Sequence, residues 1–205
     1  TPYLGKGRIM KVFTEEGGLI TLMAKKSLHA SFAPFCVAEW IYRKKQSEIF
    51  TLMEGSLLDG LLMLRQSYGA LMAAGSMAQD LIRTQLPGKP APGLYSLLTS
   101  YFKKIALFER PAVLAASFRV KLLLHEGLLA LQMGCAYCER EAGSLMEGVS
   151  VCPAHSAPFA IQFSIPEWHI LHSLAYARQF SLLQEIDCSP SLNEKISAFF
   201  EERMK

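Results

Sequence analysis

Apolar and polar positions alternate in four short segments near the start of the chain, a pattern that predicts β-strands. These segments cover residues 8–13, 19–24, 34–45 and 48–54. Gly17 and Gly18 predict a turn between the first two. Apolar residues fall on both faces of the third segment, which favours a strand that is covered on both sides over much of its length.

After Gly55 the chain becomes rich in leucine, methionine and alanine, and long segments with few charges predict buried helices. These segments cover residues 56–86 (one or two helices), 94–109, 112–133, 165–184 and 191–204. Pro111 and Gly134 bracket the third of them, as expected for a helix start and end. Ser191 and Glu194 have the spacing of a capping box. The pattern predicts an α+β chain, with a β domain over residues 1–54 and an α-helical domain over 55–205.

The composition permits one good-sized domain or two small ones, since the chain has 205 residues and is 51% apolar. Residues 148–166 form the longest run without a charged side chain, and its three prolines make it a poor membrane-spanning helix. We see no secretory signal and expect no membrane association. Five cysteines, three of them in metal-ligand spacing, fit a reducing cytosol better than a disulfide scaffold.

The positive charge of the chain is concentrated at its beginning. The net charge is only +3, yet the first fifty residues hold eight basic and four acidic side chains. The remainder is therefore close to neutral. This asymmetry places a basic β segment ahead of a nearly neutral helical body.

Residues 135–155 hold three of the five cysteines and one histidine, in two pairs with the spacing Cys-x-x-Cys and Cys-x-x-His. Two such turns can each present two ligands to one tetrahedral zinc ion. The pattern predicts a zinc site made by Cys135, Cys138, Cys152 and His155. Four protein donors fill the coordination shell, which favours structural Zn²⁺ over catalytic Zn²⁺. Two alternatives remain: unrelated buried thiols beside a core histidine, or redox use of the first pair alone.

Other chemical motifs are incomplete, so the sequence favours a protein without catalytic residues. His125-Glu126 lacks the second histidine of a metalloprotease helix, and Gly88-Lys89 lacks the first glycine of a phosphate-binding loop. The pair His169 and His172 falls on a predicted amphipathic helix, where partly buried histidines are common. Cys36 and Cys188 are interpreted as packing or bystander residues.

Several stretches together resemble the RecO family of bacterial recombination mediators. They are GRIMKVFTEEGGLITLMAKK, PFCVAEWIYRKK, FRVKLLLHEGLLALQMGCAYC and VCPAH. The resemblance covers essentially the whole chain and implies an oligonucleotide-binding (OB) barrel followed by a helical domain with a zinc-knuckle insert. The family usually begins with a further strand ahead of Thr1, so the barrel looks incomplete here. The loop after Lys26 is also shorter and less basic than usual.

The resemblance further implies a non-enzymatic DNA repair and recombination protein of the bacterial cytoplasm, associated with the nucleoid. Such a protein binds single- and double-stranded DNA and anneals complementary strands. Its implied partners are RecR and the C-terminal tail of the single-strand-binding protein, with which it helps to load the recombinase. No nucleotide hydrolysis is implied. The rival hypotheses are a zinc-stabilised protein–protein adapter without direct DNA binding, and an enzyme that uses the zinc directly.

An OB barrel binds single strands with a positive groove and with aromatic side chains on which bases stack. Basic residues near the predicted strand ends are the candidate phosphate contacts: Lys6, Arg8, Lys11, Lys25, Lys26, His29, Arg43, Lys44 and Lys45. Tyr3, Trp40 and Tyr42 are candidate stacking faces. The alternatives are a solvated basic rim and, for Trp40, a place in the core.

A partner's acidic tail with apolar end residues would need an apolar groove flanked by basic side chains. The candidate residues are Arg65, Phe118, Arg119 and Leu122, with Arg83 as a further basic neighbour. Their alternative interpretation places Phe118 and Leu122 in the helical core. Lysine-rich surfaces hold phosphates without reading bases, so the absence of base-reading motifs is compatible with strand annealing.

Overall fold

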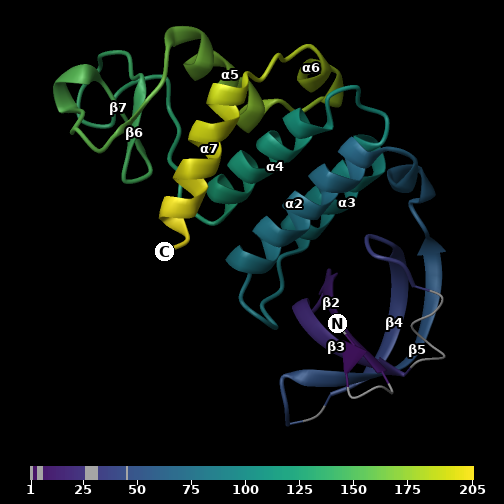
Figure 1. Cartoon of the computed structure of the whole chain (residues 1–205). Coiled ribbons are helices and arrows are strands. Elements are labelled where there is room, and N and C mark those ends of the chain that lie inside the picture. Colours follow the sequence, from purple (N-terminus) through teal and green to yellow (C-terminus); the bar gives the residue numbers. More distant parts are fainter. Residues whose placement is uncertain (1, 4–6, 26–31, 45) are drawn as a thin grey trace. The chain divides into compact units, whose positions relative to one another are not determined.

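The computed structural model describes residues 2–3, 7–25, 32–44 and 46–205 (Figure 1). The chain divides into two compact units, one formed by residues 1–74 and 85–106 and the other by residues 75–84 and 107–205. Strands come first and most of the helices follow, which confirms the predicted α+β class. The predicted division at residues 54 and 55 stays a prediction.

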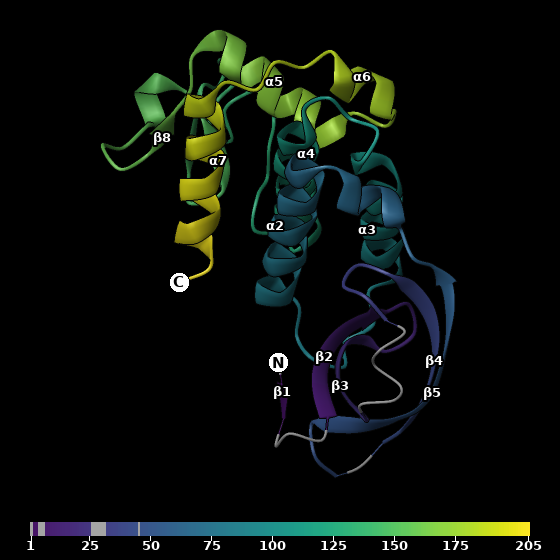
Figure 2. The same ribbon diagram turned by 45° about the vertical axis from the view of Figure 1, so that its right-hand side comes forward.

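The first unit contains a five-stranded sheet in the order β1-β2-β3-β5-β4. Its strands are β1 (Pro2–Tyr3), β2 (Gly7–Thr14), β3 (Gly18–Lys25), β4 (Val37–Arg43) and β5 (Ile49–Asp59). Strands β3 and β5 run parallel, and the other neighbours are antiparallel. The sheet curves strongly (Figures 1 and 2). Within the described residues β1 does not pair with β4, so the barrel is not closed, as the sequence predicted.

A glycine turn joins β2 to β3, at the predicted position. Thr14 Oγ1 accepts a hydrogen bond from the Gly17 amide at 3.0 Å. Gly18 has φ +63°, and a Cβ built on it would lie 1.9 Å from the carbonyl oxygen of Lys89. Only glycine permits this approach of two backbones.

Alternate side chains of the sheet form its core. The buried cluster consists of Ile20, Leu22, Ala24 and Leu52, with Met10, Val12, Trp40, Tyr42 and Phe50 packed around it. Burying each large side chain contributes about 1.5–3 kcal/mol. The ring of Trp40 lies 4.5 Å from Phe32, and Tyr42 stacks on Phe50 at 5.7 Å. The candidate stacking residues Trp40 and Tyr42 are thus partly buried and packed against the core. The side chain of Tyr3 lies outside the described residues.

The first predicted helical segment begins later than predicted. The 3-10 helix η1 covers Leu62–Gln66, α2 covers Tyr68–Thr84 and is shared between the two units, and α3 covers Pro92–Ile105. The predicted start at residue 56 is wrong, because β5 continues to Asp59. Asp59 Oδ1 then accepts a hydrogen bond from the Leu61 amide at 2.9 Å, and this Asx turn ends the strand.

The second unit is built around α4 (Pro111–His125), which packs against α5 (Ile165–Tyr176), α6 (Phe180–Gln184) and α7 (Pro190–Arg203). The prediction that α4 reaches residue 133 is wrong. Gly127 takes φ +69°, its amide bonds to Leu124 and the Leu128 amide bonds to Leu123. This Schellman motif ends the helix at His125.

The N-terminal caps of α5 and α7 differ from the predicted capping box. Ser164 and Glu167 form the capping box of α5, with the Ser164 amide 2.8 Å from Glu167 Oε2. Helix α7 is capped by Ser189, whose Oγ accepts from the Leu192 amide at 3.1 Å. The predicted capping box at Ser191 is therefore wrong, because Pro190 already occupies the first turn. No helix among the described residues has the length and apolar character needed to cross a membrane.

Candidate functional site

The three knuckle cysteines and the histidine converge on one point in the second unit. The ligand atoms of Cys135, Cys138, Cys152 and His155 all lie within 4.8 Å of one another. His155 Nδ1 is 3.4 Å from Cys135 Sγ, 3.6 Å from Cys138 Sγ and 3.5 Å from Cys152 Sγ. Cys138 Sγ is 3.7 Å from Cys152 Sγ. The sequence prediction that these four residues come together agrees with this geometry.

These distances fit a tetrahedral zinc ion. With ordinary zinc bond lengths, two sulfurs lie about 3.8 Å apart and a sulfur and a nitrogen about 3.6 Å apart. Thiolate and imidazole are also the donors that zinc prefers. The residues therefore fit a metal ion, and four protein donors leave no position for a reacting water.

Short backbone hydrogen bonds shape the two turns. In the first knuckle the Cys135 amide donates to the Arg140 carbonyl at 2.8 Å. In the second, Pro153–His155 form the 3-10 helix η2, and the His155 amide donates to the Cys152 carbonyl at 3.0 Å. Each pair of ligands is thus held by one tight bend, as the two-residue spacing requires.

A small sheet joins the two knuckles. Its strands are β6 (Ser144–Met146), β7 (Val149–Val151) and β8 (Ile161–Gln162), in the order β7-β6-β8. The β6–β7 turn uses Glu147 at φ +51° and Gly148 at φ +91°, so both take left-handed conformations. The Ala136 amide of the first knuckle donates to the Ser150 carbonyl on β7 at 2.8 Å.

Sequence reasoning missed Ser150, which ties the knuckle sheet to the segment that enters it. Its side chain is fully buried. Its Oγ accepts from the Gln132 amide at 2.9 Å, and the Ala130 amide donates to the Gly148 carbonyl at 2.7 Å. The alternation of Val149, Ser150 and Val151 could have indicated a strand, but a serine there gave no sign of its buried role.

The surroundings of the thiols lower the pKa at two of the three positions. Burial raises the pKa of Cys135, but hydrogen bonds from the backbone of Tyr137 and Cys152 and from His155 outweigh it and lower the pKa to about 6. The pKa of Cys152 is lowered by similar backbone bonds despite its burial. At Cys138 a backbone hydrogen bond from Arg140 lowers the pKa, but burial and the neighbouring thiols outweigh it and raise the pKa. Three thiolates this close repel one another, so a cation is needed before all three can ionise together.

The candidate phosphate contacts are spread over the first unit. Lys6, Lys26, His29 and Lys45 lie outside the described residues. The other five, Arg8, Lys11, Lys25, Arg43 and Lys44, have exposed side chains.

Strand register decides which of these cations share a face, because cross-strand partners point to the same side of a sheet. Lys11 pairs with Thr21, which lies four residues before Lys25 on β3. Side chains four residues apart on a strand share a face. Lys11 and Lys25 therefore project from one side, which we call the outer face.

The register extends this face to β4. Met23, two residues from Lys25, pairs with Thr51 of β5, and Thr51 pairs with Arg43. Arg43 therefore joins Lys11 and Lys25 on the outer face. Arg8 instead pairs with Ala24, a core residue, and so lies on the opposite face.

The four candidate partner contacts differ in accessibility. Phe118 and Leu122 are fully buried in the second unit, in agreement with their alternative interpretation as core residues. Arg119 is held by Asp80, with Nε 2.7 Å from Oδ2. Arg65 is exposed on η1 in the first unit. Side chains buried in this way cannot line an open groove, so of the four only Arg65 is presented to a partner.

Comparisons with known proteins agree with the resemblance seen in the sequence. The family model described as "Recombination protein O C terminal" matches residues 65–202. The DNA repair protein RecO of Chlamydia pneumoniae is 29% identical over 97% of this chain and 82% of its own length. The protein of the same name from Chlamydia trachomatis serovar L2 is 30% identical over 94% of this chain and 83% of its own length. That of Desulforamulus reducens is 26% identical over 80% of this chain and 66% of its own length.

The family match includes the knuckle region, and the chlamydial relatives extend it through the strands of the first unit. Both parts of the molecule that the sequence singled out are thus covered by proteins of one name. The chain belongs to the RecO family of DNA repair proteins.

Proposed function

We propose that this protein is a non-enzymatic mediator of DNA repair and recombination. Its family supports a role in those processes. The finer proposal is that it binds single- and double-stranded DNA and anneals complementary strands. In this proposal it acts with RecR and the tail of the single-strand-binding protein to load recombinase.

The observation that carries the proposal is the shared face of Lys11, Lys25 and Arg43. These side chains come from three strands, and all are exposed. The described residues include no ion pair that uses any of them. Cations without a carboxylate partner are available to phosphates, and each contact releases counterions from the DNA.

Such a face suits annealing because it holds the backbone and leaves base edges free. Contacts from lysine and arginine to phosphates carry no sequence information. Trp40 and Tyr42 are partly buried, and their rings pack on Phe32 and Phe50, so base stacking on them is not part of the proposal. Affinity should then come mainly from phosphates and should fall steeply with salt.

The Cys₃His cluster would hold a structural zinc ion in this proposal. When bound, the ion would supply folding free energy to the knuckle sheet. The chain's own contribution is the pair of tight bends that places Cys135 and His155 side by side. The cluster would brace the second unit and take no part in chemistry on DNA.

The test compares the triple variant Lys11→Glu, Lys25→Glu, Arg43→Glu with a matched triple reversal at exposed lysines of the same unit, Lys89, Lys103 and Lys104. Fluorescence anisotropy with an oligothymidine at several salt concentrations measures affinity. Loss of three phosphate contacts should weaken binding at low salt by at least about tenfold and reduce the salt slope by about 2. In a strand-annealing assay, the outer-face variant should anneal complementary strands more slowly than the control variant.

Two results would contradict the proposal. An equal loss of DNA affinity in both triple variants would show that binding depends on net charge alone and not on the cations of the outer face. Absence of salt-sensitive DNA binding by the unsubstituted protein would favour the rival function, a zinc-stabilised adapter between proteins.

A further inference from the structure

The knuckle cluster is open to water on one side. Cys138 is partly exposed and His155 is exposed, whereas Cys135 is only 8% exposed and Cys152 is fully buried. The ring of Tyr137, which is 62% exposed, lies 5.6 Å from that of His155 on this open side. A small molecule in solution therefore reaches the sulfur of Cys138 more easily than the other two sulfurs.

A second sulfur lies beside this accessible one. Cys138 Sγ and Cys152 Sγ are 3.7 Å apart, and they belong to different knuckles. A disulfide bond is about 2.05 Å long, so its formation requires the two atoms to approach by about 1.7 Å. Because Cys138 is only partly buried, a change of its side-chain rotamer can supply such a movement.

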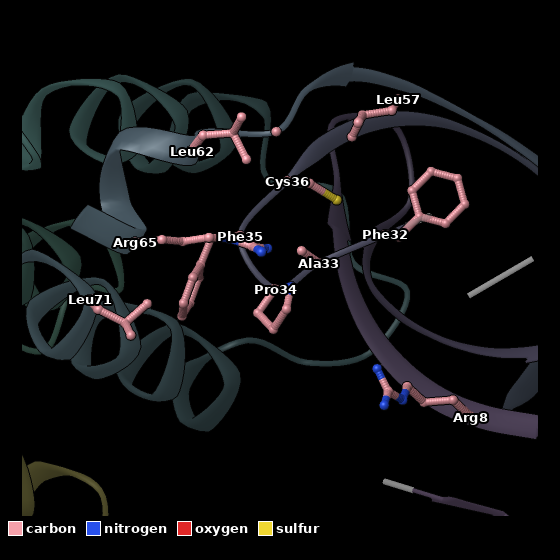
Figure 3. Close-up of a pocket in the computed structure, with 11 residues that line it drawn as sticks. Arg8, Phe32, Ala33, Pro34, Phe35, Cys36, Leu57, Leu62, Arg65 and Leu71 are labelled. Carbon is pink, nitrogen blue, oxygen red and sulfur yellow. The ribbon is translucent and has the colours of Figure 1, made fainter. Parts of the chain in front are cut away.

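The two cysteines outside the cluster have different surroundings. Figure 3 shows Cys36 at the wall of an apolar pocket in the first unit, and none of the other described residues that line this pocket is a cysteine. Cys188 lies between α6 and α7. Burial raises the pKa of both thiols, and a protonated thiol is a poor nucleophile. Oxidation should therefore concentrate in the knuckles.

We propose that Cys138 and Cys152 form a reversible modification site for peroxides, in which a disulfide bond between them takes the place of a bound metal ion. The site lies in the second unit, away from the cations of the outer face. The proposal therefore does not depend on DNA binding or strand annealing.

The oxidation proceeds in two steps. The Cys138 thiolate attacks one oxygen of hydrogen peroxide, so an S–O bond forms, the O–O bond breaks and hydroxide leaves. The Cys152 thiolate then attacks the sulfur of this sulfenic acid, so the disulfide bond forms and a second hydroxide leaves. The two sulfurs together lose two electrons, and the peroxide gains them.

Disulfide formation removes two of the four metal donors. Cys135 and His155 remain, and two ligands are too few for a structural zinc site. The new bond nevertheless joins the same two turns that the four donors bring together. Ser150 still ties β7 to the entering segment, because its Oγ accepts from the Gln132 amide at 2.9 Å. We therefore expect the oxidised protein to lose metal and to retain the knuckle sheet.

A disulfide bond from Cys135 to Cys138 is the alternative product. It would close only the first knuckle, where the Cys135 amide already donates to the Arg140 carbonyl at 2.8 Å. The bond from Cys138 to Cys152 closes a longer loop and joins both knuckles, so it stabilises the folded chain more. The structure therefore favours the pair that spans the two knuckles.

The test treats the full chain with increasing hydrogen peroxide, blocks the free thiols, digests the protein without reductant and maps disulfide bonds by mass spectrometry. The main product should be the link between Cys138 and Cys152. A chromogenic chelator should register one zinc ion released for each disulfide bond formed. Dithiothreitol with added zinc should restore the metal content. Protein that carries no metal after purification is judged by the same disulfide map.

Matched variants separate replacement of the metal from damage. The double variant Cys36→Ser, Cys188→Ser should give the same link and the same release of zinc as the unsubstituted protein. Cys138→Ser can form neither the metal site nor the proposed link. The oxidised unsubstituted protein should therefore melt at a higher temperature than Cys138→Ser does, and an equal melting temperature would show that the link does not replace the metal.

The disulfide map can also overturn the proposal directly. A link between Cys135 and Cys138, a link to Cys36 or Cys188, or release of zinc without any disulfide bond would each do so. Met63, which is 52% exposed, supplies an internal measure of peroxide dose, because exposed methionines are oxidised to sulfoxides. Knuckle thiols that stay reduced after Met63 has become a sulfoxide would likewise rule out a peroxide-sensitive site.

Discussion

Arg119 Nε donates to Asp80 Oδ2 at 2.7 Å, in a part of the helical unit where the aspartate side chain is only 6% exposed. The same guanidinium donates to Ser197 Oγ at 2.6 Å and to Ser76 Oγ at 3.0 Å. It also lies 5.3 Å from the ring centre of Phe200. One side chain therefore joins three helices, and this explains why it is not offered to a partner.

Removing Arg119 should destabilise the protein strongly. Arg119→Ala leaves Asp80 buried without its cation, which typically costs about 3–5 kcal/mol. Urea unfolding followed by circular dichroism measures the loss. The control is Arg83→Ala, because the Arg83–Glu201 pair is exposed and such pairs are worth less than about 1 kcal/mol. Similar losses of unfolding free energy in the two variants would show that the buried Arg119–Asp80 pair stabilises the protein no more than the exposed Arg83–Glu201 pair does.

The knuckle cluster predicts one zinc ion per chain, measurable by elemental analysis. Cys138→Ser should lose the metal, and a chelator should lower the melting temperature of the unsubstituted protein because metal binding is coupled to folding. His155→Cys should retain metal, since four thiolates also suit zinc. Cys188→Ser is the control outside the cluster. Unchanged stability after complete metal removal would contradict a structural role.

The sequence predicted the ligand set because ligand spacing is a local property. Cys-x-x-Cys and Cys-x-x-His each describe one turn, and the backbone bonds within those turns need no distant contact. The β2–β3 hairpin was predictable for the same reason, since Gly17 and Gly18 specify their own turn. Secondary structure that depends on contacts with distant residues was harder to predict from the sequence. The segment 56–61 holds three leucines and no strict alternation, and only its pairing with β4 makes its first residues a strand.

The arrangement of the basic side chains was also only partly predictable from the sequence. The sequence located the basic residues, and strand alternation separates Arg8 from Lys11 three positions later. Only the strand register shows that Lys11, Lys25 and Arg43 of different strands share a face. The burial of Phe118 follows from helices that pack on α4 from distant parts of the chain. The end of α4 was predictable in retrospect, since Gly127 follows its last turn.

The contact between Glu167 and Lys195 should make stability depend on pH in acid. Lys195 and the backbone of Ser164 lower the pKa of Glu167 to about 2, well below its unfolded value near 4.3. Glu167 therefore contributes stability above about pH 4.3 that is lost as the pH falls toward 2. Lys195→Met should cost about 1 kcal/mol at pH 6, because the pair is partly screened by water, and much less at pH 2. Urea titrations at the two pH values measure the difference. An equal loss of stability at pH 6 and pH 2 would show that the ion pair with Glu167 does not cause the effect of Lys195→Met.

Gly148 should tolerate no side chain. It has φ +91°, and a Cβ there would lie 2.5 Å from the carbonyl oxygen of Leu128. Gly148→Ala should therefore cost about 2 kcal/mol or more, because the left-handed conformation and the backbone clash add together. Gly75→Ala is the matched control: Gly75 lies inside α2 with open space around its Cβ position, so alanine there should stabilise by about 0.5–1 kcal/mol. Thermal unfolding separates the two, and chelator competition adds a local readout, since Gly148→Ala should also release metal faster from the adjoining knuckles. If both variants unfolded alike and kept their metal equally, the turn at Gly148 would not be what holds the two pairs of ligands together.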